Sequence, residues 1–347
     1  MHTFNNIKIA NVAIHFVGNK NNGDSLLVAK SPLAFSDEIS QLLVSYFTSP
    51  FKSEAYYNFY HETDLHLNEV YNYVSEIFSN PDSLYEQSVK LAKHLFEQSV
   101  HPKIKPGEFY VVHFKGCQLN GEETDAVGLF KSENKDTFLK VYPTQDNLEE
   151  QSENGNNIHK LDKGCLVFNS QKEGGYLAVV TDNLNKATEA QYWFDHFLQV
   201  MQHNDSYLQT EYAISLCKNF VAERLPEHFE VSRADQVDLL NRSAKFFKEK
   251  ESFSLDEFAD EVMQEHKIIA SFKEYKADFE GDRDFRFDEN FEISESALKK
   301  GAKAFKSVIK LDKNFHIYIH GNRDYITKGF DEASGMSYYQ LFFREEA

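Results

Sequence analysis

One set of residues has the types and spacing of a divalent-metal nuclease. Asp125 is followed by Glu133, Asn134 and Lys135, and such enzymes use an Asp near one strand and a [DE]xK triplet on the next. The carboxylates would hold Mg²⁺ while the lysine stabilises the reacting phosphate. Residues 132–135, however, have the pattern of a hairpin turn. A turn would take Glu133 and Lys135 out of the strand register that aims both at one metal, so we keep the nuclease only as an alternative.

Two pairs of histidines stand out in the sequence, and the second of them could in principle hold a metal. His61 and His66 flank ETDL, whereas His316 and His320 flank IYI and would share one face of a strand. No carboxylate or thiol partner is indicated beside the second pair. We therefore expect surface or partly buried histidines and predict no cofactor.

The acidic segment at residues 278–284 resembles a calcium loop at first sight. An EF-hand needs Gly at its sixth position, where this chain has Arg283, although Glu289 fits the twelfth. We expect instead an exposed linker whose Phe279, Phe285 and Phe287 dock on a neighbouring element.

Basic residues concentrate near the C-terminal end of an otherwise acidic chain. The 347 residues include 37 basic and 55 acidic side chains, for a formal charge of −18, yet residues 292–347 hold nine basic and eight acidic groups. Between residues 297 and 313, Asp312 is the only acid beside six lysines. We predict these as the candidate DNA-contacting residues, with solvated lysines as the alternative: Lys299, Lys300, Lys303, Lys306, Lys310 and Lys313.

Several enzyme and membrane classes are disfavoured by the sequence. It contains no HExxH, GxSxG, GxxxxGK[ST] or GxGxxG motif. Its three cysteines are far apart, which fits a reducing cytosol, and no stretch approaches the roughly 18 apolar residues of a membrane helix. The N-terminal residues lack the pattern of a signal peptide. We predict a soluble, intracellular, non-enzymatic protein that contacts no membrane.

Periodicity predicts an α+β fold, with a mainly antiparallel sheet and packed helices followed by a helical section and a small C-terminal α/β module. The division we expect is 1–226, 227–289 and 290–347. Predicted strands cover 7–17, 25–30, 107–119, 125–131, 137–143, 163–170, 175–182, 304–311, 314–319, 324–329 and 337–344. Predicted helices cover 37–48, 67–79, 82–100, 189–202, 205–224, 232–249, 254–264, 266–277 and 294–303. Ser36 is the expected N-cap of the first of them.

Three regions carry more specific expectations. The strands at 107–119, 125–131 and 137–143 are expected to form a meander, with turns at Asn120-Gly121 and at residues 133–135, followed by an exposed loop at 144–157. Tyr192, Trp193 and Phe194 should belong to a helix face buried on the sheet. The aromatic run at 56–60 could be a sticky loop at an oligomer or partner interface, with burial in the monomer as the alternative.

Long stretches of the sequence resemble the bacterial nucleoid-associated protein family of the NdpA type, in the version common among Bacteroidetes-like bacteria. The runs that carry the likeness are 83–112, DAVGLFKSENKDTFLKV (125–141), KLDKGCLVFN (160–169), GYLAVVTDN (175–183), EAQYWFDHFLQV (189–200) and YLQTEYAISLCKNF (207–220).

The resemblance implies a non-enzymatic protein of the cytoplasm and nucleoid, with DNA and DNA-topology proteins as partners. Homo-oligomerisation is a further possibility. The acidic charge departs from the usual architectural DNA binder and equally suits contact with a basic, DNA-bound protein. A protein-only adaptor therefore stays open beside direct DNA binding.

Overall fold

The computed structural model describes residues 1–184, 192–305, 308–318 and 325–345. The chain divides into two compact units, Met1–His203 and Asn204–Ala347. The fold is α+β, as predicted. The three-part division expected from the sequence, with breaks after residues 226 and 289, stays a prediction.

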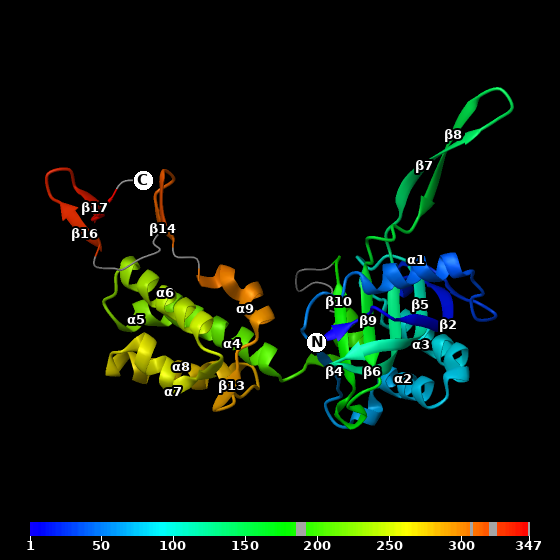
Figure 1. Cartoon of the computed structure of the whole chain (residues 1–347), viewed down its shortest axis with the longest axis horizontal. Coiled ribbons are helices and arrows are strands. Elements are labelled where there is room, and N and C mark those ends of the chain that lie inside the picture. The colour runs from blue at the N-terminus through cyan, green and yellow to red at the C-terminus, as the bar shows by residue number, and fades with distance from the viewer. Residues whose placement is uncertain (185–191, 306–307, 319–324, 346–347) are drawn as a thin grey trace. The chain divides into compact units, whose positions relative to one another are not determined.

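The first unit is built on an antiparallel sheet (Figure 1). Its strand order is β11-β4-β10-β9-β6-β5-β2-β3, and β1 also pairs with β5. Asn120 and Gly121, both with positive φ, form the tight turn between β5 and β6, as the sequence predicted. The strands are β1 (His2–Thr3), β2 (Lys8–Val17), β3 (Leu26–Val28), β4 (Tyr57–Phe59), β5 (Gly107–Leu119), β6 (Glu122–Ser132), β9 (Lys163–Phe168), β10 (Leu177–Asp182) and β11 (Val200–Gln202).

Helical segments cover both faces of this sheet. Helices α2 (Glu69–Ser79) and α3 (Leu84–Gln98) and the π-helical segment η6 (Tyr192–Leu198) pack on one face, and α1 (Asp37–Thr48) packs on the other. Val127 and Leu129 of β6 therefore face one core while Ala126 and Phe130 face the second. Burial on both faces explains why the central strands are continuously apolar in sequence.

Local signals placed α1 correctly. Ser36 accepts a hydrogen bond from the backbone of Ile39, and the helix then runs over Asp37–Thr48 as predicted. Residues 192–198 are helical, as expected, and Tyr192 and Trp193 are buried while Phe194 is half-buried. The predicted helix over 189–202 is wrong at its end, because β11 pairs there with β4; residues 189–191 lie outside the described part.

The predicted meander is wrong in its third strand. β6 pairs with β9, whereas β7 (Asp136–Pro143) pairs with β8 (Leu148–Gly155), a segment expected to be a loop. Cross-strand pairs stabilise this separate hairpin: Lys140 contacts Glu153 at 3.3 Å and Tyr142 donates to Glu149 at 3.1 Å. Figure 1 shows the hairpin, which we call the arm, extending away from the sheet.

The aromatic run at 56–60 is not a free loop. Its residues form β4, which joins the sheet between β10 and β11, and both Tyr56 and Phe59 are buried. Burial in the monomer is therefore confirmed for Tyr56 and Phe59, whereas Tyr60 at the end of the run is 38% exposed.

The second unit is mostly helical and has its own aromatic core. Phe253 stacks between Phe247 and Phe291, with ring centroids 5.4 and 5.0 Å away. Its segments are α4 (Ser206–Asn219), η7 (Phe220–Arg224), α5 (Leu225–His228), α6 (Arg233–Glu249), β12 (Ser252–Ser254), α7 (Leu255–Phe258), η8 (Ala259–Met263), α8 (His266–Asp282), β13 (Asn290–Glu292), α9 (Glu295–Gly301), η9 (Ala302–Phe305), β14 (Val308–Leu311), β15 (Phe315–Tyr318), β16 (Ile326–Asp331) and β17 (Met336–Leu341).

The segment resembling a calcium loop is largely helical. Helix α8 continues through residue 282, so the expected exposed linker begins later than predicted. Phe279 and Phe285 are buried, and both rings pack edge-on against Tyr212 of α4 at 5.9 and 4.8 Å. Burial of these aromatic rings stabilises this part of the second unit.

Candidate nucleic-acid interface

Helix α9 positions two of the predicted lysines. Ser294 caps its first turn by accepting from Ala297, and Gly301 ends it against α4. A Cβ at Gly301 would lie 2.8 Å from Ile214 Cδ1, so glycine allows the two helices to approach closely. Lys299 and Lys300 lie in the last turn, where the helix dipole favours cations.

The hairpin of β14 and β15 presents its polar face next to α9. Lys310 pairs with His316 and Val308 pairs with Tyr318, so these four side chains share one face. Ile309 on the opposite face is buried and packs with Ala234 and Val237 of α6. This packing fixes which side of the hairpin Lys310 occupies.

Helix α6 contributes the third set of side chains to this site. Ser232 and Asp235 form a reciprocal capping box at its start. Farther along, Asn241, Ala244 and Lys248 follow one another at spacings of three and four residues, so they share a face of the helix.

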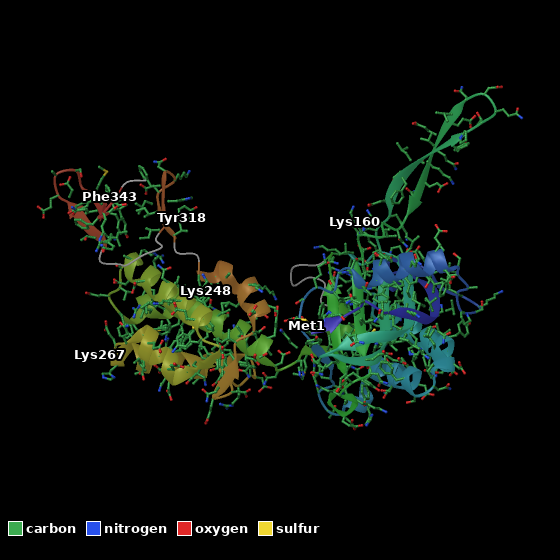
Figure 2. The ribbon with its side chains drawn as sticks, in the orientation of Figure 1. Met1, Lys160, Lys248, Lys267, Tyr318 and Phe343 are labelled. Carbon is green, nitrogen blue, oxygen red and sulfur yellow. The ribbon has the colours of Figure 1, made fainter. Side chains whose placement is uncertain are left out.

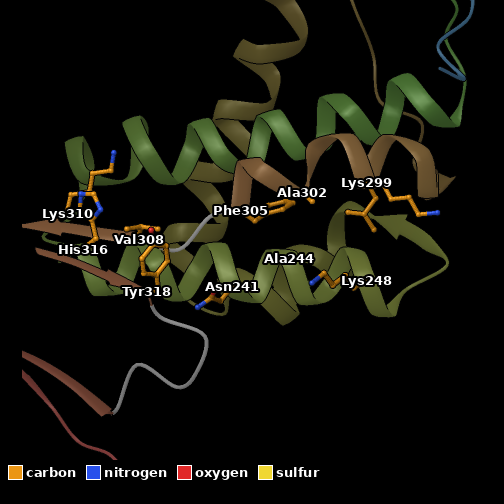
Figure 3. A pocket seen from close by; sticks show the side chains of 11 residues that line it. Asn241, Ala244, Lys248, Lys299, Ala302, Phe305, Val308, Lys310, His316 and Tyr318 are labelled. Carbon is orange, nitrogen blue, oxygen red and sulfur yellow. The ribbon is translucent and has the colours of Figure 1, made fainter. Parts of the chain in front are cut away.

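These elements enclose a cavity of about 780 Å³, which we call the basic cavity (Figure 3). In Figure 3, Lys310 and His316 lie at one end, Lys248 and Lys299 lie at the other, and Phe305 lies between them. No carboxylate is among the eleven lining residues, although the chain as a whole is strongly acidic. The lining residues are Asn241, Ala244, Lys248, Leu298, Lys299, Ala302, Phe305, Val308, Lys310, His316 and Tyr318.

The lysines of the basic cavity are largely free to bind an anion. Lys299 contacts Glu295 at 3.1 Å, but both side chains are strongly exposed, and such surface pairs contribute little. Within the described residues, neither Lys248 nor Lys310 has a salt-bridge partner.

The structure brings together two of the six predicted lysines, Lys299 and Lys310. Lys300 instead points to α4, where it contacts Glu211 at 2.8 Å. Burial alone lowers the pKa of Lys300, but the hydrogen bond and charge of Glu211 outweigh it and raise the pKa overall. Lys313 is exposed in the turn between β14 and β15. Lys306 and the side chain of Lys303 lie outside the described residues.

Sequence reasoning missed Lys248, Asn241 and Tyr318. The spacing of Asn241, Ala244 and Lys248 could have indicated a shared helix face. Nothing local, however, relates that face to a hairpin some 60 residues later in the chain. His316 was noted as a metal candidate with His320, which lies outside the described residues.

The nuclease residues are not assembled. Asp125 lies within β6 whereas Glu133 directly follows its last residue, and eight residues of extended chain span roughly 26 Å. Asp125 contacts His113 at 3.0 Å. Lys135 pairs with Glu108 on β5. Across the described ranges, no three potential metal-ligating side chains gather into a site.

Glu133 belongs to a buried polar network. Its carboxylate contacts Lys131 at 3.1 Å and accepts a hydrogen bond from Tyr192 at 2.8 Å, while Lys163 contacts Asp182 at 2.9 Å. Burial lowers the pKa of Lys131 and raises that of Tyr192. The network joins β6, β9, β10 and η6. Packing and charge compensation within it explain why the Glu133 carboxylate is buried.

A second cavity, of about 890 Å³, lies in the first unit near the base of the arm. It also contains lysines, but Lys160 is paired with Asp136 at 2.9 Å and Lys135 is paired with Glu108. Asp136 and Asp162 contribute carboxylates to its lining. The basic cavity of the second unit is therefore the better candidate for a polyanion.

Comparison with known proteins supplies a family. A family model described as nucleoid-associated protein YejK matches residues 13–334. No curated protein sequence matches the chain. No helix within the described residues is long and apolar enough to cross a membrane. The matched span includes every residue that lines the basic cavity.

Proposed function

This chain belongs to the family of nucleoid-associated protein YejK, and from that membership we propose that it binds DNA through the basic cavity of its second unit. The family places the protein at the nucleoid, in the bacterial cytoplasm. The proposed activity is binding, with no covalent chemistry.

One observation carries the proposal. In a chain with 18 more acidic than basic residues, three lysines line a cavity that has no carboxylate among the lining side chains that the structure describes. Phosphate oxygens are the partners that such a local excess of ammonium groups favours. The acidic remainder of the surface repels DNA at long range, which would restrict contact to this region.

Fluorescence anisotropy with labelled DNA at several salt concentrations tests the proposal. We expect binding at low salt, and we expect the double change Lys248→Gln, Lys310→Gln to weaken it. For each lysine–phosphate interaction that the change removes, the plot of log K against log salt should become flatter by about 0.7 for a single strand or 0.9 for a duplex. Absence of binding by the unaltered protein at low salt would remove direct DNA contact.

The matched control is Lys218→Gln with Lys267→Gln. Both lysines are exposed on helices of the same unit, α4 and α8, and neither lines the cavity; Figure 2 labels Lys267. The control removes the same total charge. An equal loss of affinity in both double variants would show that net charge, and not the cavity, governs binding.

A second candidate function is protein binding through the arm, without direct DNA contact. Residues 136–155 contain five acids and one lysine, and Leu139, Val141 and Leu148 are 74%, 55% and 68% exposed. An apolar strip with acids around it suits a partner whose apolar surface is bordered by basic residues, as on a DNA-bound protein. Capture of partners, including DNA-topology proteins, after nuclease treatment of a lysate would measure this function separately.

A further inference from the structure

We infer that the basic cavity receives an unpaired base of single-stranded DNA, with the ring of Tyr318 as its stacking platform. This inference rests on the proposed function and adds the form of DNA that the site prefers. It starts from the shape of the site. A cavity of about 780 Å³ lies in the size range of pockets that enclose small organic groups. A duplex keeps its bases stacked inside and offers only groove edges and phosphates, so it cannot fill such a space.

The lining is suited to the flat face of a base. Apolar side chains from three elements form much of the wall, namely Ala244 of α6, Leu298 of α9, and Ala302 and Phe305 of η9. Tyr318 at the end of β15 is 63% exposed although it lines the cavity, so its ring is available for stacking. Phe305 is buried in the core of the second unit and does not compete for this role.

The charges favour a strand over a free nucleotide. Lys310 and Lys248 lie toward opposite ends of the cavity, with the apolar wall between them (Figure 3). A base held in the middle would leave the phosphates on its two sides near separate ammonium groups. A cationic groove with aromatic platforms is the usual way in which proteins hold single strands without sequence preference.

The test compares labelled oligo-dT with a duplex of the same length by anisotropy, using the full chain at one salt concentration. We expect tighter binding of the single strand. Tyr318→Ala should weaken single-strand binding by about 5- to 150-fold, the range expected for the loss of one stacked base, and should change duplex binding little. Tyr318→Trp keeps an aromatic face and should retain the preference.

Phe315→Ala is the matched control. Phe315 lies on the same strand and is 65% exposed, but it shares the hairpin face of Ile309 and Ile317, away from the cavity. This change should leave single-strand affinity unaltered. Far-UV circular dichroism of each variant checks that the unit remains folded.

Three results would overturn the inference. Equal affinity for both DNA forms, together with no effect of Tyr318→Ala, would exclude base stacking while leaving the lysine-dependent function intact. Binding of dTMP as tight as that of oligo-dT would exclude a role for neighbouring phosphates. No binding of either DNA form at low salt would reject the proposed function itself.

Discussion

His15 is a single residue whose ionisation is opposed by its surroundings. Its Nδ1 atom accepts from the backbone N–H of Ala29 at 3.2 Å, and its Nε2 atom lies 2.9 Å from Ser88 Oγ. Ser88 itself donates to the carbonyl of Tyr85, so Nε2 is the donor toward Ser88. Both ring nitrogens are therefore used by the neutral form, and burial lowers the pKa of His15.

Acid should consequently destabilise the first unit. Below the usual histidine pKa of about 6.5 the unfolded chain binds a proton that folded His15 does not, so the free energy of unfolding falls as pH decreases. The binding of one such proton lowers the free energy of unfolding by at most about 1.4 kcal/mol per pH unit. We expect His15→Asn to reduce this slope in urea unfolding followed by the fluorescence of Trp193.

Some acid sensitivity should remain in that variant. Burial also lowers the pKa of His2, which lies between Tyr56 and the carbonyl of Phe51. An identical pH slope before and after the His15 change would contradict the assignment of a neutral native ring.

At the scale of elements, the arm combines regular pairing with unusual exposure. The register of β7 and β8 puts Leu139, Val141 and Leu148 on one face. On the opposite face, side chains already make contacts within the hairpin, since Phe138 lies against Gly155 and Lys140 contacts Glu153. The first face is therefore the one suited to a protein partner.

Leu139→Ser with Val141→Ser should abolish partner capture from nuclease-treated lysate if the arm is a docking element. The same variant should unfold with the same midpoint as the unaltered protein when unfolding is followed by Trp193 fluorescence. Neither side chain belongs to a core of the first unit. Gln151→Ser, on the opposite face, is the control. Undiminished capture by the double variant would exclude the arm as the binding element.

Sequence patterns predicted elements well where the determinants are local. Ser36 and the apolar spacing after it indicated α1 within its observed bounds, and the hairpin turn at Asn120 and Gly121 was also identified. The errors concern pairing between distant segments. Nothing in the residues of β7 indicates that β6 will pair with β9, because that choice depends on which strand completes a sheet buried on both faces.

The candidate site was predictable only in part, for the same reason. Lys299 and Lys310 belong to one short basic stretch that is visible in composition. Lys248 and Asn241 reach the cavity because Ile309 of β14 packs on α6, a tertiary contact that no local pattern encodes. Lys300 was indistinguishable from Lys299 in sequence. Consecutive residues of a helix point in different directions, however, and on α9 the side chain of Lys300 points toward Glu211.

At the scale of the whole molecule, the hydrophobic cores of the first unit are separate from that of the second. The single tryptophan, Trp193, is fully buried in the first unit, whereas much of the helical structure lies in the second. We expect denaturant unfolding to give different midpoints by tryptophan fluorescence and by far-UV circular dichroism.

A fragment of residues 1–203 should reproduce the tryptophan transition of the full chain. Its sheet and both of its cores are contained within those residues. Coincident transitions in the full chain, combined with a fragment that does not fold, would show that the two units depend on each other for stability.

The three cysteines are buried, and burial raises the pKa of Cys117 to about 12 and that of Cys165 and Cys217 well above the ordinary range. Almost no thiolate, the nucleophilic form, is thus present at neutral pH. A cysteine introduced on the surface would react with maleimide dyes far faster than any native thiol. Energy-transfer pairs could therefore be attached to the folded wild-type background, one on each unit, without first removing a native cysteine.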